Sequence, residues 1–261
     1  MIRIQNYVMA ESLEQAYQLN QNKRSRILGG MLWLKLSNIA VHTAIDLSRL
    51  GLNAIEETEE EFSIGAMTTL RQLELHEGLN AYANGAVAKA VHDIVGVQFR
   101  NMATVGGSLF GRFGFSDVLT VFLAMDAYVE LYRGGIVPLE TFANMEKDRD
   151  ILVRLIVKKK PGCFAYQAMR NQRTDFPILT CAAAKVDGEY RVVVGARPAS
   201  ARVLRDEKGL LSGGVNEESA RAFAAFAAET LPTGGNVRGT AEYRTHLIRV
   251  LTRRTLTELE G

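Results

Sequence analysis

The sequence predicts an α+β fold with two domains. Segments of strand character and of helix character are grouped along the chain without a regular β-α-β alternation, which favours an α+β fold over a doubly wound sheet. A chain of 261 residues with 47% hydrophobic content can bury a substantial core, and its length suits one large domain or two modest ones. Pro161-Gly162 is a turn signal, so we expect domains at residues 1–160 and 161–261.

Residues 1–53 are expected to form a first subdomain with the order strand, helix, strand. Ser12 can accept a hydrogen bond from the first turn of a helix over Leu13–Asn20. The short apolar runs Arg26–Leu28 and Thr43–Leu47 have the length and composition of strands.

Residues 54–160 are expected to form a second subdomain. Alternating apolar and polar residues in Ala54–Glu56 and Glu61–Ile64 predict an antiparallel pair of strands around an acidic turn. Thr69 is a candidate helix start. Further along, the apolar spacing predicts one buried helix over Tyr82–Val95.

A glycine-rich loop is predicted over Gly106–Gly114. After it, Ser116 can cap an apolar helix that ends near Asp126. Strands over Tyr128–Tyr132 and Ile151–Lys158 are expected to complete the second subdomain.

The second domain is predicted to contain antiparallel strands followed by two helices. Thr180–Val186 and Tyr190–Gly195 have strand character, and Asp187-Gly188 between them is a strong hairpin signal. The helices are expected over Glu217–Leu231 and about Ala241–Leu259.

Composition argues against several classes of function. The 31 Lys+Arg and 29 Asp+Glu residues nearly cancel and form no basic stripe, so we expect no nucleic-acid partner. The longest strongly apolar stretch, Val118–Met125, is too short to cross a bilayer, and the first residues do not resemble a secretory signal; we expect a cytoplasmic location and no membrane partner. The two cysteines, Cys163 and Cys181, cannot bind an iron–sulfur cluster alone, and the four histidines lack metal-ligand spacing.

Two Gly-Gly loops, Ile27–Trp33 and Ala103–Ser108, are the candidate binding elements. Glycine lets a ligand approach the main chain without meeting a Cβ, and successive N–H groups in a bend form a concave anion site. Two such loops facing each other could hold a diphosphate, while Asp117 could accept hydrogen bonds from sugar hydroxyls. Because neither G-x-G-x-x-G nor G-K-[ST] occurs, these residues alone predict no more than a candidate nucleotide-binding domain.

Together, these motifs resemble the FAD-binding subunit of the xanthine dehydrogenase and carbon monoxide dehydrogenase family. The most specific motif is Arg100-Asn101-Met102-Ala103-Thr104-Val105-Gly106-Gly107, followed by Ser116-Asp117-Val118-Leu119 and an apolar helix. Ile27-Leu28-Gly29-Gly30 and Ile64-Gly65-Ala66-Met67-Thr68 add to a resemblance that covers nearly the whole chain. It implies a two-part FAD-binding domain of the vanillyl-alcohol-oxidase/PCMH type and a small C-terminal domain with an antiparallel sheet and helices.

The resemblance also implies a set of residues that bind FAD. Both loops would cradle the diphosphate, Ser116 and Asp117 match a serine–aspartate pair that contacts the cofactor, and Ala66 and Leu152 would contact it from neighbouring strands. No catalytic side chain and no metal ligand is implied. The cofactor-binding residues expected in this way are Ile27, Leu28, Gly29, Gly30, Met31, Leu32, Trp33, Ala66, Ala103, Thr104, Gly106, Gly107, Ser108, Gly111, Ser116, Asp117, Leu152 and Tyr166.

Members of this family work with an iron–sulfur subunit and a molybdopterin subunit. The resemblance therefore implies that electrons run from molybdenum through the clusters to FAD and then to an acceptor, commonly NAD. In that arrangement the chain is a subunit of a molybdenum-containing hydroxylase and carries FAD as an oxidoreductase. The absence of cluster-binding cysteines agrees with this division of labour.

The sequence departs from the family pattern at four positions. Met31 and Leu32 replace the polar pair that usually follows Gly-Gly in the first loop, so two side-chain hydrogen bonds to the cofactor are lost. At about 0.5–1.5 kcal/mol each, this loss predicts a weakening of FAD binding by roughly tenfold or more. Ser108 replaces the usual asparagine, and Tyr166 stands where many members carry a lysine near the flavin.

Two alternatives stay open at the level of sequence. The first is a scaffold subunit of the same kind of complex that has lost strong FAD binding, which the Met31 and Leu32 replacements favour. The second is a free-standing flavin oxidoreductase that acts on a small molecule, which the lack of an acid–base constellation near the loops disfavours. Flavin content separates the first alternative from the FAD-binding hypothesis, and turnover without partners would identify the second.

Overall fold

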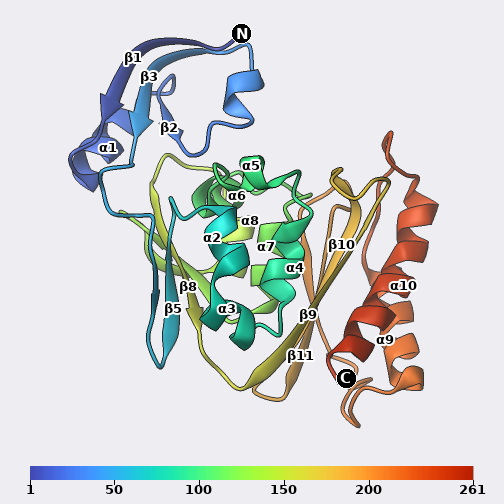
Figure 1. Ribbon diagram of the computed structural model, residues 1–261. Coiled ribbons are helices and arrows are strands. Elements are labelled where there is room, and N and C mark those ends of the chain that lie inside the picture. Colours follow the sequence, from blue (N-terminus) through green and yellow to red (C-terminus); the bar gives the residue numbers. More distant parts are fainter. Residues whose placement is uncertain (261) are drawn as a thin grey trace.

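Three sheets organise the protein, whose computed structural model describes residues 1–260 (Figure 1). The first sheet is parallel and has the strand order β1-β3-β2. Ser12 accepts a hydrogen bond from the Gln15 amide and begins α1, as the sequence predicts. The elements of this region are β1 (Arg3–Met9), α1 (Leu13–Asn20), β2 (Arg26–Leu28), the 3-10 helix η1 (Leu34–Leu36) and β3 (Ala40–Asp46).

The second sheet is antiparallel, has the order β4-β5-β8-β6-β7 and is covered by a group of short helices. Its strands are β4 (Ile55–Glu57), β5 (Glu61–Gly65), β6 (Ala127–Leu131), β7 (Gly135–Pro138) and β8 (Leu152–Lys158). The helices are α2 (Leu70–Leu75), α3 (Glu77–Tyr82), α4 (Ala86–His92), α5 (Val97–Arg100), α6 (Val105–Phe110), α7 (Asp117–Ala124) and α8 (Leu139–Asn144). Helix α7 is buried along its whole length, because apolar residues occupy every face of it.

The third sheet is antiparallel and has the order β12-β11-β10-β9. It lies between the central helices and the pair α9 and α10, so the two inner strands are buried on both faces (Figure 1). Phe164 and Tyr166 pack toward the central core, whereas Ala165 packs toward α9 and α10. The elements are β9 (Gly162–Arg170), β10 (Pro177–Val186), β11 (Glu189–Gly195), β12 (Arg202–Arg205), α9 (Glu217–Thr230) and α10 (Ala241–Glu258).

The predicted α+β fold class is confirmed, and so is the hairpin between β10 and β11. Asp187 and Gly188 have φ values of 51° and 83°, as a two-residue turn of type I′ requires. The domain boundary near Pro161-Gly162 stays a prediction, and Gly261 lies outside the described residues. Within residues 1–260, none of the helices is long and apolar enough to cross a membrane.

Two predicted elements are wrong. The single helix expected over Tyr82–Val95 is divided, because Asn84 and Gly85 adopt left-handed φ values of 50° and 75° and the chain turns there. The loop expected to begin at Gly106 instead contains α6. Thr104 caps this helix, since its hydroxyl oxygen accepts the Gly107 amide at 3.1 Å.

Candidate functional site

Two cavities meet beneath the first Gly-Gly loop. The larger has a volume of about 610 Å³ and extends to the start of β10, while the smaller measures about 280 Å³ and extends to the start of β8. Both volumes are in or near the range of small-molecule and cofactor sites. Six residues line both cavities and therefore mark their junction: Arg26, Ile27, Gly29, Thr104, Gly107 and Gly111.

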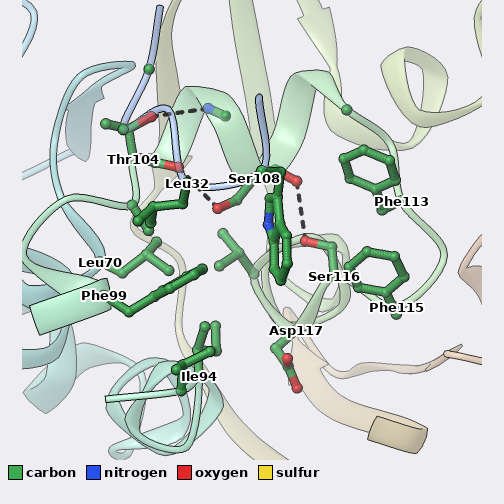
Figure 2. Close-up of a pocket in the computed structure, with 18 of the residues that line it drawn as sticks. Leu32, Leu70, Ile94, Phe99, Thr104, Ser108, Phe113, Phe115, Ser116 and Asp117 are labelled. Carbon is green, nitrogen blue, oxygen red and sulfur yellow. Dashed lines mark hydrogen bonds between the residues drawn. The ribbon is translucent and has the colours of Figure 1, made fainter. Parts of the chain in front are cut away.

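The walls of the larger cavity are mostly apolar and aromatic. Figure 2 shows Leu70, Ile94 and Phe99 on one side and Phe113 and Phe115 on the other. A third wall comes from the segment between β9 and β10 and from the first residue of β10, which together contribute Thr174, Asp175, Phe176 and Pro177. Flat apolar walls on several sides suit a planar ring system with polar edges.

The two Gly-Gly segments touch each other although more than seventy positions separate them. A Cβ atom on Gly30 would lie 1.9 Å from the carbonyl oxygen of Met102, and one on Gly29 would lie 2.8 Å from Oγ1 of Thr104. Only glycine permits these approaches. At Gly107, in contrast, a Cβ would meet Thr104 Oγ1 alone, at 3.1 Å, so this glycine leaves open space at the junction.

The amides of the two segments differ in what they can offer to a ligand. Those of α6 are used by the protein: Val105 donates to the Thr68 carbonyl, Gly106 to the Ala66 carbonyl and Gly107 to Thr104 Oγ1. The amides from Gly29 to Trp33 donate to no acceptor within residues 1–260. Five consecutive free donors therefore border the larger cavity, whereas the amides of Val105, Gly106 and Gly107 are already used within the protein.

Asp117 lies in the wall of the larger cavity at the start of α7 and is almost fully buried. Its Oδ1 accepts hydrogen bonds from the Tyr166 hydroxyl and from Nη2 of Arg170, the latter at 2.5 Å. Burial raises the pKa of Asp117, while the charge of Arg170 and the two hydrogen bonds oppose that rise. Neither donor binds Oδ2, which leaves the second oxygen as an acceptor for a ligand hydroxyl.

Ser108 and Ser116 are already engaged within the protein. The hydroxyl of Ser116 donates to the carbonyl of Ser108 at 3.1 Å and accepts the Leu119 amide, so it fixes the start of α7 against α6 (Figure 2). The Ser108 hydroxyl donates to the carbonyl of Thr104 at 2.9 Å. Both side chains shape the cavity wall rather than present free donors.

The structure brings together nearly all of the residues expected from the sequence. Tyr166 is the exception, because it is 2% exposed and stands behind Asp117 without lining either cavity. The remaining expected residues line the larger cavity, the smaller cavity or both: Ile27, Leu28, Gly29, Gly30, Met31, Leu32, Trp33, Ala66, Ala103, Thr104, Gly106, Gly107, Ser108, Gly111, Ser116, Asp117 and Leu152.

Several cavity residues were not expected from the sequence. Arg170 and the aromatic residues Phe113 and Phe115 reach the cavity only through tertiary contacts, such as the hydrogen bond from Arg170 to Asp117, which no local sequence pattern predicts. Arg26 directly precedes the first loop, and a cation three positions before a Gly-Gly pair was a signal that could have been used. No group of three or more His, Cys, Asp or Glu side chains within the described residues could hold a metal ion.

The fold and these cavities define a protein with a two-part ligand site, in which a largely apolar larger cavity bordered by free backbone donors joins a smaller cavity. Comparison with known families gives that class a specific identity. The family described as the FAD binding domain in molybdopterin dehydrogenase matches residues 2–159, and the CO dehydrogenase flavoprotein C-terminal domain matches residues 164–259. The chain belongs to this family of FAD-binding oxidoreductase subunits, and its cofactor is FAD.

Curated relatives and a solved structure agree with this assignment. The chain is 26% identical to the 6-hydroxypseudooxynicotine dehydrogenase complex subunit alpha of Paenarthrobacter nicotinovorans, over 96% of this chain and 93% of that protein. It is also 26% identical to the xanthine dehydrogenase FAD-binding subunit of Escherichia coli O157:H7, over 97% and 95%. A carbon monoxide dehydrogenase structure from Hydrogenophaga pseudoflava superposes with a TM-score of 0.88, at 24% identity and over 99% of this chain and 97% of that chain, which shows the shared fold.

Proposed function

We propose that the chain holds FAD across the two cavities and serves as the electron-transfer subunit of a molybdenum-containing hydroxylase. It would take electrons from an iron–sulfur subunit and pass them to an acceptor such as NAD. The observation that carries the proposal is the junction of the cavities, where Gly29, the first of five residues with free amides, lies beside the open position at Gly107. An elongated dinucleotide with an anionic centre fits this distribution of donors and apolar walls.

We assign the two ends of the cofactor from the sizes of the two cavities. The isoalloxazine, with three fused rings, requires the cavity of about 610 Å³, and the adenine fits the cavity of about 280 Å³. The diphosphate then lies at the junction, where Gly29 and Gly107 line both cavities. When bound, FAD supplies one- and two-electron redox chemistry, while the protein provides binding, orientation and electrostatics.

Individual side chains have distinct roles in this arrangement. Oδ2 of Asp117 is the free acceptor for a ribityl or ribose hydroxyl, and Tyr166 and Arg170 hold the carboxylate through the other oxygen. Arg170 also places a positive charge in the wall of the larger cavity. Met31 and Leu32 contribute apolar surface, since they pack against the core clusters around Val41 and Leu70 rather than offer hydrogen bonds.

The partners are proposed from the names of relatives. Glyceraldehyde dehydrogenase medium chain of Sulfolobus acidocaldarius is 23% identical to this chain, and nicotine 6-hydroxylase medium subunit of Paenarthrobacter nicotinovorans is 25% identical. Both names describe one chain of a larger enzyme. We propose the same organisation here, with an iron–sulfur subunit and a molybdopterin subunit as partners.

Flavin content tests the proposal directly. The purified chain should be yellow, show flavin absorbance bands and release about one FAD per chain on denaturation. Co-expression with the proposed partner subunits should give a complex in which the organic substrate is oxidised and its electrons reduce the flavin, which bleaches these bands without added dithionite. A colourless, folded preparation that does not respond to added FAD would instead support a scaffold subunit, the role that apolar Met31 and Leu32 favour.

A further inference from the structure

Two guanidinium groups stand at the smaller cavity without a carboxylate partner. Arg26 lines both cavities and Arg149 lines the smaller one. Neither forms a salt bridge with any acidic side chain in the part of the chain that the structure describes. The same wall contains Asp148 and Asp150, but the Asp150 carboxylate accepts the amides of Arg133, Gly134 and Ile151, and neither acid pairs with either arginine. Because most buried charges in proteins are paired, two cations without a carboxylate partner in one cavity wall require an explanation.

The two groups converge on a single carbonyl oxygen. Nη1 of Arg26 donates to the carbonyl of Ser25 at 2.7 Å, and Nη2 of Arg149 donates to the same oxygen at 3.0 Å. Burial lowers the pKa of Arg149, and the nearby charge of Arg26 lowers it further. The turn between α1 and β2 therefore holds two like charges close together.

Local hydrogen bonds orient each guanidinium and leave other donors free. Arg26 also donates from Nη1 to the carbonyl of Lys23 at 2.7 Å, while its Nε and Nη2 have no acceptor within residues 1–260. Arg149 donates to the α1–β2 turn through Nε and Nη2, which leaves its Nη1 free. Pre-oriented donors of this kind match the geometry of phosphate oxygens.

We propose that Arg26 and Arg149 form a cationic clamp that binds the diphosphate of the dinucleotide at the junction of the two cavities. The proposal rests on the proposed function. A diphosphate carries two formal negative charges, so it would neutralise both guanidiniums and relieve their mutual repulsion. The clamp would also offset the hydrogen bonds that the first loop lacks because Met31 and Leu32 are apolar.

Ligands that differ in phosphate content test the clamp. Dissociation constants for FAD and riboflavin would be measured by flavin fluorescence on the full-length chain freed of flavin, and inorganic pyrophosphate would be added as a competitor. Arg26→Gln should weaken FAD binding about tenfold to hundredfold. The same change should leave riboflavin binding unaltered and make FAD binding less sensitive to salt. Arg26→Lys should restore part of the loss, since the charge returns without the planar fork.

Arg24→Gln is the matched control, because it removes the same charge two positions earlier from an exposed side chain that lines neither cavity. Arg149→Lys provides a second variant that keeps the charge if Arg149→Gln disturbs the α1–β2 turn. The clamp is refuted if Arg26→Gln and Arg24→Gln have equal effects, or if riboflavin binding falls as much as FAD binding. If the unaltered chain binds pyrophosphate through Arg26 but binds no FAD, the clamp stands and the proposed function fails.

Discussion

Tyr166 donates a hydrogen bond to Oδ1 of Asp117 across 49 positions of the chain, joining β9 of the third sheet to the first turn of α7. Both side chains are almost completely buried. Tyr166 was expected to stand beside the flavin, but it acts one layer further back, where it holds a carboxylate that lines the cavity. Its contribution to the site is therefore positional, and it couples the third sheet to the site.

The hydrogen bond from Tyr166 to Asp117 should contribute measurably to stability. Tyr166→Phe should lower the free energy of unfolding by about 1.5–3 kcal/mol, the usual range for a hydrogen bond to a charged group. Tyr128→Phe is a suitable control, because its hydroxyl bonds Asp126 in a more exposed setting. Equal losses in the two variants, measured by urea unfolding, would argue against a special role for the buried pair.

The same variant should show a characteristic pH dependence. Burial already raises the pKa of Asp117 above its ordinary 3.8, and removal of the Tyr166 hydroxyl should raise it further. A carboxyl with a raised folded-state pKa stabilises the fold below the unfolded-state value, and this stabilisation is lost as the pH rises through the folded-state pKa. The destabilisation by Tyr166→Phe should therefore grow with pH; melting temperatures between pH 4 and pH 8 would reveal a flat difference if this reasoning is wrong.

Substitution of Gly107 should impair FAD binding, whereas substitution of Gly30 should impair stability. Gly107→Val should abolish FAD retention and leave a folded protein, because the added side chain meets only Thr104 Oγ1 and enters the junction of the cavities. Gly30→Ala should lower the melting temperature, because a Cβ there would overlap the Met102 carbonyl. Normal FAD content in Gly107→Val, measured by absorbance after gel filtration, would show that the diphosphate does not lie at this junction.

Glu74 should provide acid-sensitive stability to the group of short helices. Burial raises the pKa of Glu74, but hydrogen bonds from Arg100, Arg71 and His92 outweigh it and lower the pKa from 4.5 to about 2. A lowered pKa contributes stability above pH 4.5 that is lost as the pH falls toward 2, here about 3 kcal/mol. Glu74→Gln should remove this pH dependence, and identical unfolding curves for both proteins across that range would contradict the assignment.

Trp33 should report on cofactor binding without a label. It is the only tryptophan, is 46% exposed and lines the larger cavity between Phe99 and Phe176, at ring-centroid distances of 5.7 and 5.3 Å. Added FAD should quench most of its fluorescence, because isoalloxazine absorbs where tryptophan emits. The Trp33→Phe variant should give no signal but keep its flavin absorbance; unchanged Trp33 emission at saturating FAD would place the ring system elsewhere.

The sequence predicts local structure well where one side chain controls it. Ser12, Thr69 and Ser116 each cap the helix expected after them, because the hydroxyl acts within three residues of itself. The helix over Tyr82–Val95 was mispredicted, since apolar spacing continues through a turn that Asn84 and Gly85 form in left-handed conformations. Periodicity alone does not detect such a break.

For the site, the sequence predicts which residues take part, but their hydrogen bonds depend on tertiary contacts. The two Gly-Gly segments were identified from their motifs, but the different use of their amides depends on acceptors such as the Ala66 and Thr68 carbonyls. The pairing of Arg170 with Asp117 could not be predicted either, because it joins the end of β9 to the start of α7 across 53 positions of the chain. Family resemblance supplied the positions, and tertiary contacts determine what each one does.

The two cavities differ in how much of the chain each one needs. The smaller is lined entirely by residues between Asn20 and Leu152, whereas the larger also requires the wall from Arg170 to Pro177. During synthesis on the ribosome, the adenine-sized compartment can therefore close before the compartment for the ring system exists. FAD would then bind late in biogenesis, because a nascent chain that stalls before β10 has formed only the smaller cavity.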